Sequence, residues 1–216
     1  MTQMAKLRKR YHYGRLHKRD DRDYPFTPVV TARVCRFWRQ RRRAYQAGPS
    51  CVGFAWENWG LCAPIVNEFP GVLIYNLAKC FDEWPGFDYD GTSIRAGAKV
   101  LLHAGMISEY RFGWDLQDII PTILVRGPVV FGTQWRSGMD QPDREGIIRA
   151  KGRVVEGHAY LVNGFDGRRG LLRIQNSWHR WGLCGRSVAF LPAEDAARLL
   201  ASDGEACLAI ETIPSS

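Results

Sequence analysis

The chain changes character near Gly127, and this change limits the folds open to it more than any other feature of the sequence. Before that point apolar residues recur with helical spacing. After it the apolar runs are short, rich in β-prone residues and separated by Gly and Asp. The sequence therefore predicts an α+β protein with a mainly helical half, residues 24–126, and a mainly β half, residues 127–216. The predicted strands are Pro128–Phe131, His158–Phe165, Leu171–Gln175 and Ser187–Leu191.

Helix signals are clearest in three places before Gly127. A loop with Gly and Pro ends at Ser50, and the apolar run after it predicts a helix with Cys51 in its first turn. Thr92 is a suitable N-cap for a second helix, which ends before Gly105. A proline is expected to bend or split the third. The predicted helices are Cys51–Trp59, the segment 92–105, Leu116–Val125 and a short, very basic helix over Arg33–Arg43.

The charge is concentrated at the N-terminus. The net charge is +8, but residues 1–45 hold fourteen Lys or Arg against three Asp, whereas the rest of the 216-residue chain is mildly acidic. A chain of this length suits one domain, or two half-domains that share a cleft. We expect residues 1–23 to form a basic arm that is extended or disordered. Such an arm acts as a solvated segment, or makes weak contact with nucleic acid or an acidic surface.

The sequence points to neither a membrane span nor an export signal. No uncharged apolar run approaches the roughly 18 residues of a membrane span, and the basic N-terminus lacks an apolar stretch and a cleavage site. We expect a cytoplasmic protein of a bacterium or a virus, with virion association as an option and the oligomeric state open. The cysteines lack the spacing of disulfide frameworks and metal sites, so we expect no cofactor and mostly reduced, buried thiols at Cys35, Cys51, Cys62, Cys80, Cys184 and Cys207.

Cys51 and His158 are candidates for nucleophilic catalysis. A thiol becomes a good nucleophile when it loses its proton, and both the N-terminal end of a helix and an imidazolium stabilise the thiolate. Cys51, in a first helical turn, has the first of these. In the structural alternative Cys51 is a packing residue and His158 an ordinary histidine at a sheet edge.

Strand geometry favours a pairing of His158 with Asn176. We expect a five-residue hairpin loop over Asp166–Gly170. His158 then lies opposite Trp178, and Asn176 is its diagonal neighbour on the same sheet face. An asparagine oxygen at that position can reach the imidazole. Because side chains alternate along a strand, a loop one residue shorter or longer would put the two on opposite faces.

Three ordered blocks of the sequence resemble those of the papain-like cysteine peptidases of the C1 family, in particular compact bacterial and bacteriophage members. Shorter segments at 22–25, 90–96 and 127–130 are also similar to family segments, so the resemblance covers roughly residues 20 to 212. The three blocks are Gln46-Ala-Gly-Pro-Ser-Cys51-Val-Gly-Phe-Ala-Trp56, Glu156-Gly-His158-Ala-Tyr-Leu-Val-Asn-Gly-Phe165, and Asn176-Ser-Trp178 with Trp181-Gly182 and Gly185.

The resemblance implies a papain-like fold, in which the active site lies in the cleft between a helical half and an antiparallel β half. It also implies cleavage of peptide bonds through a thioester. Cys51 would attack the acyl carbon, His158 would transfer protons, and Asn176 would fix the imidazole tautomer. The Gln46 side chain and the backbone N–H of Cys51 would stabilise the oxyanion. The implied substrate-binding residues are Trp135, Met139, Gly157 and Trp178, the last also covering the hydrogen bond between His158 and Asn176.

The sequence departs from the family pattern at Gln46, which stands one residue closer to Cys51 than is usual. This departure keeps one alternative open, a binding or scaffold protein with weak or no activity. A second alternative, a cell-wall amidase or endopeptidase, stays open because other folds reuse a Cys–His pair. The substrate is accordingly a polypeptide or a peptidoglycan peptide. Only 50 residues precede Cys51, so we do not expect the long inhibitory propeptide of secreted relatives.

Overall fold

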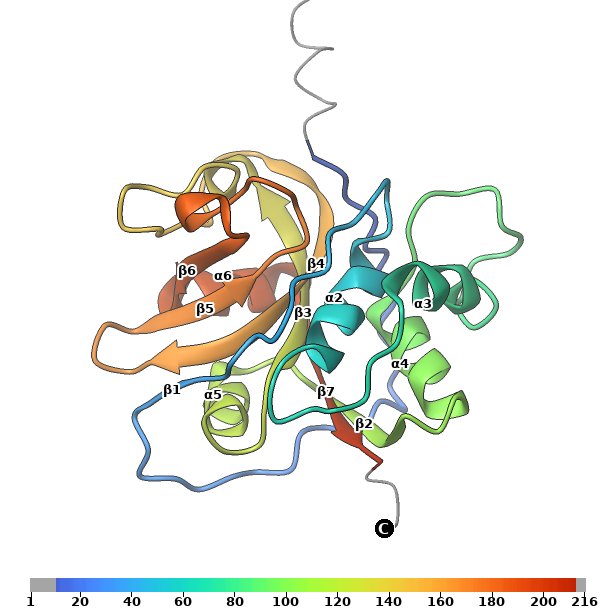
Figure 1. Ribbon diagram of the computed structural model, residues 1–216, viewed down its shortest axis with the longest axis horizontal. Helices are drawn as coiled ribbons and strands as arrows, with labels where there is room; N and C mark the ends of the chain where they lie inside the picture. The colour runs from blue at the N-terminus through green and yellow to red at the C-terminus, as the bar shows by residue number, and fades with distance from the viewer. Residues whose placement is uncertain (1–10, 213–216) are drawn as a thin grey trace, which may run out of the picture.

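The computed structural model describes residues 11–212, which form a helical part and a sheet part side by side (Figure 1). Within this range seven strands form one sheet in the order β2-β7-β3-β4-β5-β6, with β1 also beside β4, and every strand pair is antiparallel. The predicted α+β fold class is confirmed. The helices are α2 (Cys51–Gly60), α3 (Gly71–Ala78), α4 (Ile94–His103), α5 (Leu116–Val125) and α6 (Ala193–Asp203). The strands are β1 (Cys35–Phe37), β2 (Ile107–Gly113), β3 (Val129–Arg136), β4 (Val154–Asp166), β5 (Leu171–Gln175), β6 (Val188–Pro192) and β7 (Glu205–Glu211).

Two apolar clusters cover the two faces of the sheet. Alternate residues of a strand point to opposite faces, so Val130 of β3 packs with the α2 tryptophans while its neighbour Phe131 packs with α5 and α6. On the helical side the largest buried side chains are Trp56 and Trp59, each 1% exposed. Burial on both faces fixes α2 against the middle of the sheet, next to β4.

Three of the four predicted helices are present, with one change of cap. Ser93, not Thr92, caps α4: its hydroxyl accepts a hydrogen bond from the Ala96 N–H at 3.1 Å. Pro121 lies inside α5 without ending it. The sequence signals did not identify α3, β2, α6 or β7.

The expected basic helix over Arg33–Arg43 is wrong, because Cys35–Phe37 forms strand β1 instead. β4 extends past the end of β3, whose pairing stops at Val162. This leaves an open edge at the end of β4, and β1 pairs with it from Gly164 to Asp166. An unpaired strand edge exposes backbone donors and acceptors. Pairing these groups with β1 stabilises the fold more than a short helix of weak propensity would.

Replacing Gly164 by alanine is expected to lower the free energy of unfolding by about 1–3 kcal/mol. A Cβ built at this glycine would lie 2.3 Å from a ring carbon of Phe37 and 2.7 Å from the carbonyl oxygen of Arg36. β1 would have to move away from β4. Urea unfolding measures the effect, and Val30→Ala, at a fully exposed side chain, is the control. Equal stability of Gly164→Ala and the parent would contradict the prediction.

The β4–β5 hairpin reaches the predicted register by an unexpected route. Asp166 pairs with Leu171, so the loop has one residue fewer than predicted. A β-bulge at Asn163 then shifts the register by one residue, and Leu161 pairs with Gln175 as the longer loop would have required. His158 and Asn176 therefore meet although the predicted loop is wrong.

Several other features bear on function. Within residues 11–212 no helix is both long and apolar enough to cross a bilayer, and no group of three or more His, Cys, Asp or Glu in that range could hold a metal ion. All six cysteines are free, as predicted, but only Cys51, Cys62 and Cys207 are buried; Cys35, Cys80 and Cys184 are exposed.

Candidate active site

Cys51 is the first residue of α2 and is fully buried against β4. Its sulfur accepts a hydrogen bond from the backbone N–H of Ala159 at 3.4 Å, which places the thiol beside the residue that follows His158. The N–H groups of a first helical turn lack acceptors within the helix, and their partial positive charge favours an anion there. The thiol is therefore at a position suited to a thiolate.

The ring of His158 has a defined tautomer. Its Nε2 lies 2.9 Å from Oδ1 of Asn176, and the backbone N–H of Ser177 donates to the same Oδ1 at 2.7 Å. Because Ser177 donates to this atom, it is the acceptor oxygen of the amide, and Nε2 must carry the hydrogen. In the neutral ring Nδ1 is then an acceptor; it is buried and has no hydrogen-bond partner among residues 11–212.

Aromatic rings enclose this imidazole. Trp178 stacks on it with ring centroids 4.4 Å apart, and Trp135 meets it edge-on at 5.1 Å. Trp135 is held in turn by a hydrogen bond from its indole N–H to Asp140 at 2.8 Å. Trp135 and Met139 are fully buried in the same apolar cluster. In this state they present no surface to a ligand, and Trp135 contacts the imidazole from within the core.

Gln46 lies next to the histidine–asparagine pair. Its backbone N–H donates to the carbonyl of Ser177 at 2.9 Å, and its side-chain oxygen accepts from the Ser177 hydroxyl at 2.6 Å. Its side-chain amide donates to the carbonyls of Gly48, at 2.8 Å, and of His12, at 3.1 Å. One of its two N–H groups is thus taken up by a residue of the N-terminal arm.

Residues 11–17 of the arm lie between β4 and the start of α4, a region that we call the groove; the dark-blue trace enters there in Figure 1. On the sheet side the N–H groups of Gly14 and Arg15 donate to the carbonyl of Gly157 at 3.3 and 3.1 Å. On the helical side Thr92 donates to the carbonyl of Gly14 and accepts from the N–H of Leu16, each at 2.9 Å. The arm is therefore hydrogen-bonded to both walls; residues 1–10 lie outside the described part.

The arm also covers the reactive groups. Tyr11 stacks on Trp178 at 4.4 Å, and the ring of Tyr13 meets His158 edge-on at 5.6 Å. Gly14 passes so close to the 46–50 loop that an added Cβ would lie 2.0 Å from the carbonyl oxygen of Pro49. Both Cys51 and His158 are 0% exposed.

This burial disfavours charge on both reactive groups. Burial raises the pKa of the Cys51 thiol to about 12, although N–H groups of Ala159 and Val52 act in the opposite direction. Burial lowers the pKa of His158 to about 3, and the hydrogen bond to Asn176 offsets this only in part. The sequence suggested a thiolate beside an imidazolium. With the arm docked, the pair is instead a neutral thiol and a neutral imidazole, because desolvation penalises both ions.

Two basic side chains anchor the arm to two carboxylates, Asp203 at the end of α6 and Glu205 at the start of β7. Arg15, 4% exposed, donates to Glu205 at 3.1 Å and to Asp203 at 3.4 Å. The ring of His17 lies between the same two carboxylates, with Nε2 3.4 Å from Glu205. Burial lowers the pKa of His17, but Glu205 and Asp203 raise it, and the net result is a raised pKa.

Raising the pH is expected to loosen the arm. The pKa of His17 is higher when the arm is docked than when it is free, so protonation of His17 stabilises docking. This stabilisation is complete below the ordinary histidine pKa of about 6.5, and it is lost as the pH rises through the raised pKa of the docked state. The groups facing His17 are Asp203, Glu205 and Arg15. The rate at which an electrophile labels Cys51 should therefore rise as the pH passes through the raised pKa of His17. This rise should come in addition to the rise that deprotonation of the thiol itself produces. His17→Gln, which cannot titrate, should lack the extra step, and identical profiles would refute the prediction.

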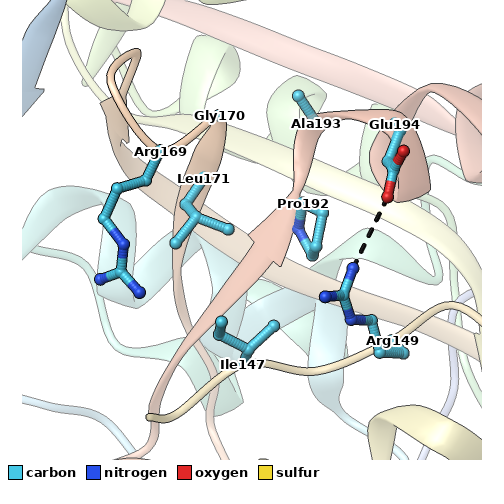
Figure 2. A pocket seen from close by; sticks show the side chains of 8 residues that line it. All are labelled: Ile147, Arg149, Arg169, Gly170, Leu171, Pro192, Ala193 and Glu194. Carbon is cyan, nitrogen blue, oxygen red and sulfur yellow. Dashed lines mark ion pairs between the residues drawn. The ribbon is translucent and has the colours of Figure 1, made fainter.

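A hollow of about 450 Å³ lies away from these residues. It is lined by the β4–β5 turn, the start of α6 and the segment before β4 (Figure 2). Its Arg149 pairs with Glu194 at 3.6 Å, and its Arg169 pairs with Glu145 at 2.9 Å. It holds none of the predicted site residues.

The structure brings together most of the predicted site and adds residues that sequence reasoning missed. Cys51, His158, Asn176, Gln46, Gly157 and Trp178 surround one groove. The missed residues are those of the arm and its anchors. Their signal was present: an aromatic and glycine run, Tyr11-His-Tyr-Gly14, interrupts an otherwise charged segment. The missed residues are Tyr11, Tyr13, Gly14, Arg15, His17, Thr92, Asp203 and Glu205.

Known structures match the chain along nearly its whole length, whereas no family model and no curated protein sequence matches it. Xylellain, a cysteine protease from Xylella fastidiosa, has 19% sequence identity and a TM-score of 0.77 over 95% of this chain and 98% of that one. Digestive procathepsin L2 from Tenebrio molitor has 16% sequence identity and a TM-score of 0.66, over 97% of this chain and 81% of that one. Procathepsin B S9 from Trypanosoma congolense has 12% sequence identity and a TM-score of 0.67, over 94% of this chain and 87% of that one. The chain therefore has the fold of the papain-like cysteine proteases.

Proposed function

We propose that the protein is a cysteine-type peptidase that hydrolyses peptide bonds through Cys51, His158 and Asn176. One observation carries the proposal. Asn176 holds the imidazole with its hydrogen on Nε2, which leaves Nδ1 as a proton acceptor in the groove where Cys51 begins α2. A base with a fixed tautomer and a thiol at a helix start together are the parts that thiol catalysis needs.

The reaction begins when the arm leaves the groove. With water and substrate present, the proton of the Cys51 sulfur passes to Nδ1 of His158, and the first turn of α2 stabilises the thiolate. The thiolate attacks the carbonyl carbon of a peptide bond, the C–N bond breaks, and the imidazolium gives its proton to the departing amine. Water then attacks the thioester while His158 accepts its proton, and this proton returns to sulfur as the acid leaves. Asn176 keeps the ring oriented throughout.

The remaining groove residues have supporting roles in this proposal. The backbone N–H of Cys51 and the side-chain amide of Gln46 donate to the oxyanion. Arm departure removes the His12 carbonyl from Gln46, which frees an N–H for this purpose. Trp178 shields the histidine–asparagine hydrogen bond from water. Gly157 faces the substrate backbone, while Trp135 supports the imidazole from the core, where Met139 lies in the same apolar cluster.

A peptidyl electrophile tests the proposal. We expect it to modify Cys51 and to abolish hydrolysis of a peptide library in proportion to that modification, as mass-spectrometric mapping can show. The exposed Cys35, Cys80 and Cys184 are internal references for ordinary thiol reactivity. Hydrolysis that persists when Cys51 is fully modified would exclude the proposed nucleophile. No hydrolysis, with Cys51 no more reactive than the references once the arm is released, would favour a scaffold protein.

A further inference from the structure

The side chain of Arg15 occupies a pocket of its own within the groove. Its guanidinium lies between the carboxylates of Glu205 and Asp203, while its backbone N–H is bonded to Gly157, the residue before His158. The positive charge of Arg15 lowers the pKa of the Cys51 thiol, so the pocket lies within electrostatic reach of the sulfur. Arg15 thus sits where a side chain of a peptide bound across the site would sit.

Glycines shape this pocket for a long side chain. Gly132 of β3 pairs with Glu205 of β7, and a Cβ on Gly132 would lie 2.4 Å from Cδ1 of Ile94 and 2.8 Å from Nε of Arg15. A Cβ on Gly157 would lie 2.2 Å from the Arg15 carbonyl oxygen. A larger residue at position 132 would crowd both Ile94 and the arginine stem, and one at position 157 would exclude the arm backbone. The groove is therefore fitted both to an extended backbone and to a long cationic side chain.

The carboxylates of the pocket are held at unfavourable positions. Glu205 is 2% exposed, and a buried carboxylate destabilises a fold unless a cation pairs with it. Asp203 is the last residue of α6, where the helix dipole disfavours an anion, and its φ of 149° is unusual for a residue other than glycine. Such combinations persist mainly where function requires them.

We infer that the pocket formed by Gly132, Asp203 and Glu205 is a substrate subsite that takes the side chain of an arginine or lysine in the peptide, and that Arg15 occupies it while the arm is docked. This inference rests on the proposed peptidase function and names its substrate class. When the arm leaves, Arg15 and His17 leave with it, and two carboxylates remain without these partners. A basic peptide side chain restores the charge balance, whereas an apolar one leaves Glu205 buried and unpaired.

Peptide binding to a full-length variant tests the subsite without relying on catalysis. The variant carries Gly14→Val, to release the arm, and Cys51→Ala, to prevent turnover. The probes are fluorescent peptides with a single arginine at successive positions, each matched to a peptide with neutral citrulline there. At one position we expect arginine to bind at least about tenfold more tightly, because a charge-assisted hydrogen bond is lost with citrulline. Equal binding of every matched pair, or no binding by any peptide, would overturn the inference.

Replacing a carboxylate of the pocket by a carboxamide tests which groups are responsible for the arginine preference. Adding Glu205→Gln should reduce the arginine preference to less than about threefold. If this buried change prevents folding, Asp203→Asn at the more exposed carboxylate serves instead and should weaken the preference in the same direction. Gln134→Ala is the matched control, since Gln134 donates to Asp203 at 2.9 Å but carries no charge. A preference that survives both carboxylate changes would contradict the assignment.

Hydrolysis by the Gly14→Val chain with Cys51 intact separates the two proposals. An arginine preference in binding with no hydrolysis of any peptide would leave the subsite standing and remove the peptidase function. Hydrolysis of arginine and citrulline peptides at equal rates would remove the subsite and leave the peptidase function standing.

Discussion

Replacing Gly14 by valine is expected to raise the rate at which Cys51 reacts with an electrophile by about a hundredfold or more. A side chain at position 14 would collide with the carbonyl oxygen of Pro49, 2.0 Å from the added Cβ. The backbone there also has φ of 142°, which β-branched residues avoid. The arm then cannot dock, water reaches the thiol, and the penalty of burial that raises its pKa to about 12 is removed.

Gly105→Val is the matched control for this gain. Gly105 also has a positive φ, of 68°, but lies in open space outside the groove. It should suffer the same kind of backbone strain without exposing Cys51. Labelling is followed by intact-protein mass spectrometry, with circular dichroism to show that both variants are folded. A folded Gly14→Val protein whose Cys51 reacts at the parental rate would show that the arm does not limit access.

In the arm-released protein, Cys51→Ala is expected to lower peptide hydrolysis by about 10⁵-fold or more, to the level of a protein without a nucleophile. In the proposed mechanism, alanine removes the atom that would form the acyl bond, and we expect no other cysteine to replace it. The measurement compares Gly14→Val with and without Cys51→Ala on the same peptides. Cys80→Ala, at an exposed thiol, is the control and should retain full activity. Hydrolysis within tenfold of the parent in Cys51→Ala would rule out covalent thiol catalysis.

The sequence predicted the fold class and the central elements because these depend on local patterns. Helix α2 with Cys51 at its start follows from a Gly-Pro loop before an apolar run, and β5 has the predicted bounds. The meeting of His158 and Asn176 was predicted through a hairpin loop that proved one residue too long. The bulge at Asn163 that restores the register has no local signature in this sequence, because it is set by pairing on both edges of β4.

The least predictable feature was the arm. Its composition is typical of a solvated segment, but residues 11–17 contact partners far away in sequence, such as Gly157 and Glu205. Charge patterning identifies a basic segment but not the acidic pocket that it fills. The burial of Trp135 and Met139 could not be predicted for the same reason. Both were expected at the groove surface, but both are fully buried, because burial depends on which distant segments pack over a residue.

The backbone hydrogen bonds that join the arm to Thr92 and Gly157 also matter for ligand binding. They engage only the backbone, so they would suit the main chain of almost any extended peptide. The arm, however, is part of the same molecule. A covalently tethered segment competes at an effective concentration on the order of millimolar, which a free peptide in dilute solution does not match. Access to the groove is therefore governed by how firmly the tethered segment is held rather than by how much peptide surrounds the protein.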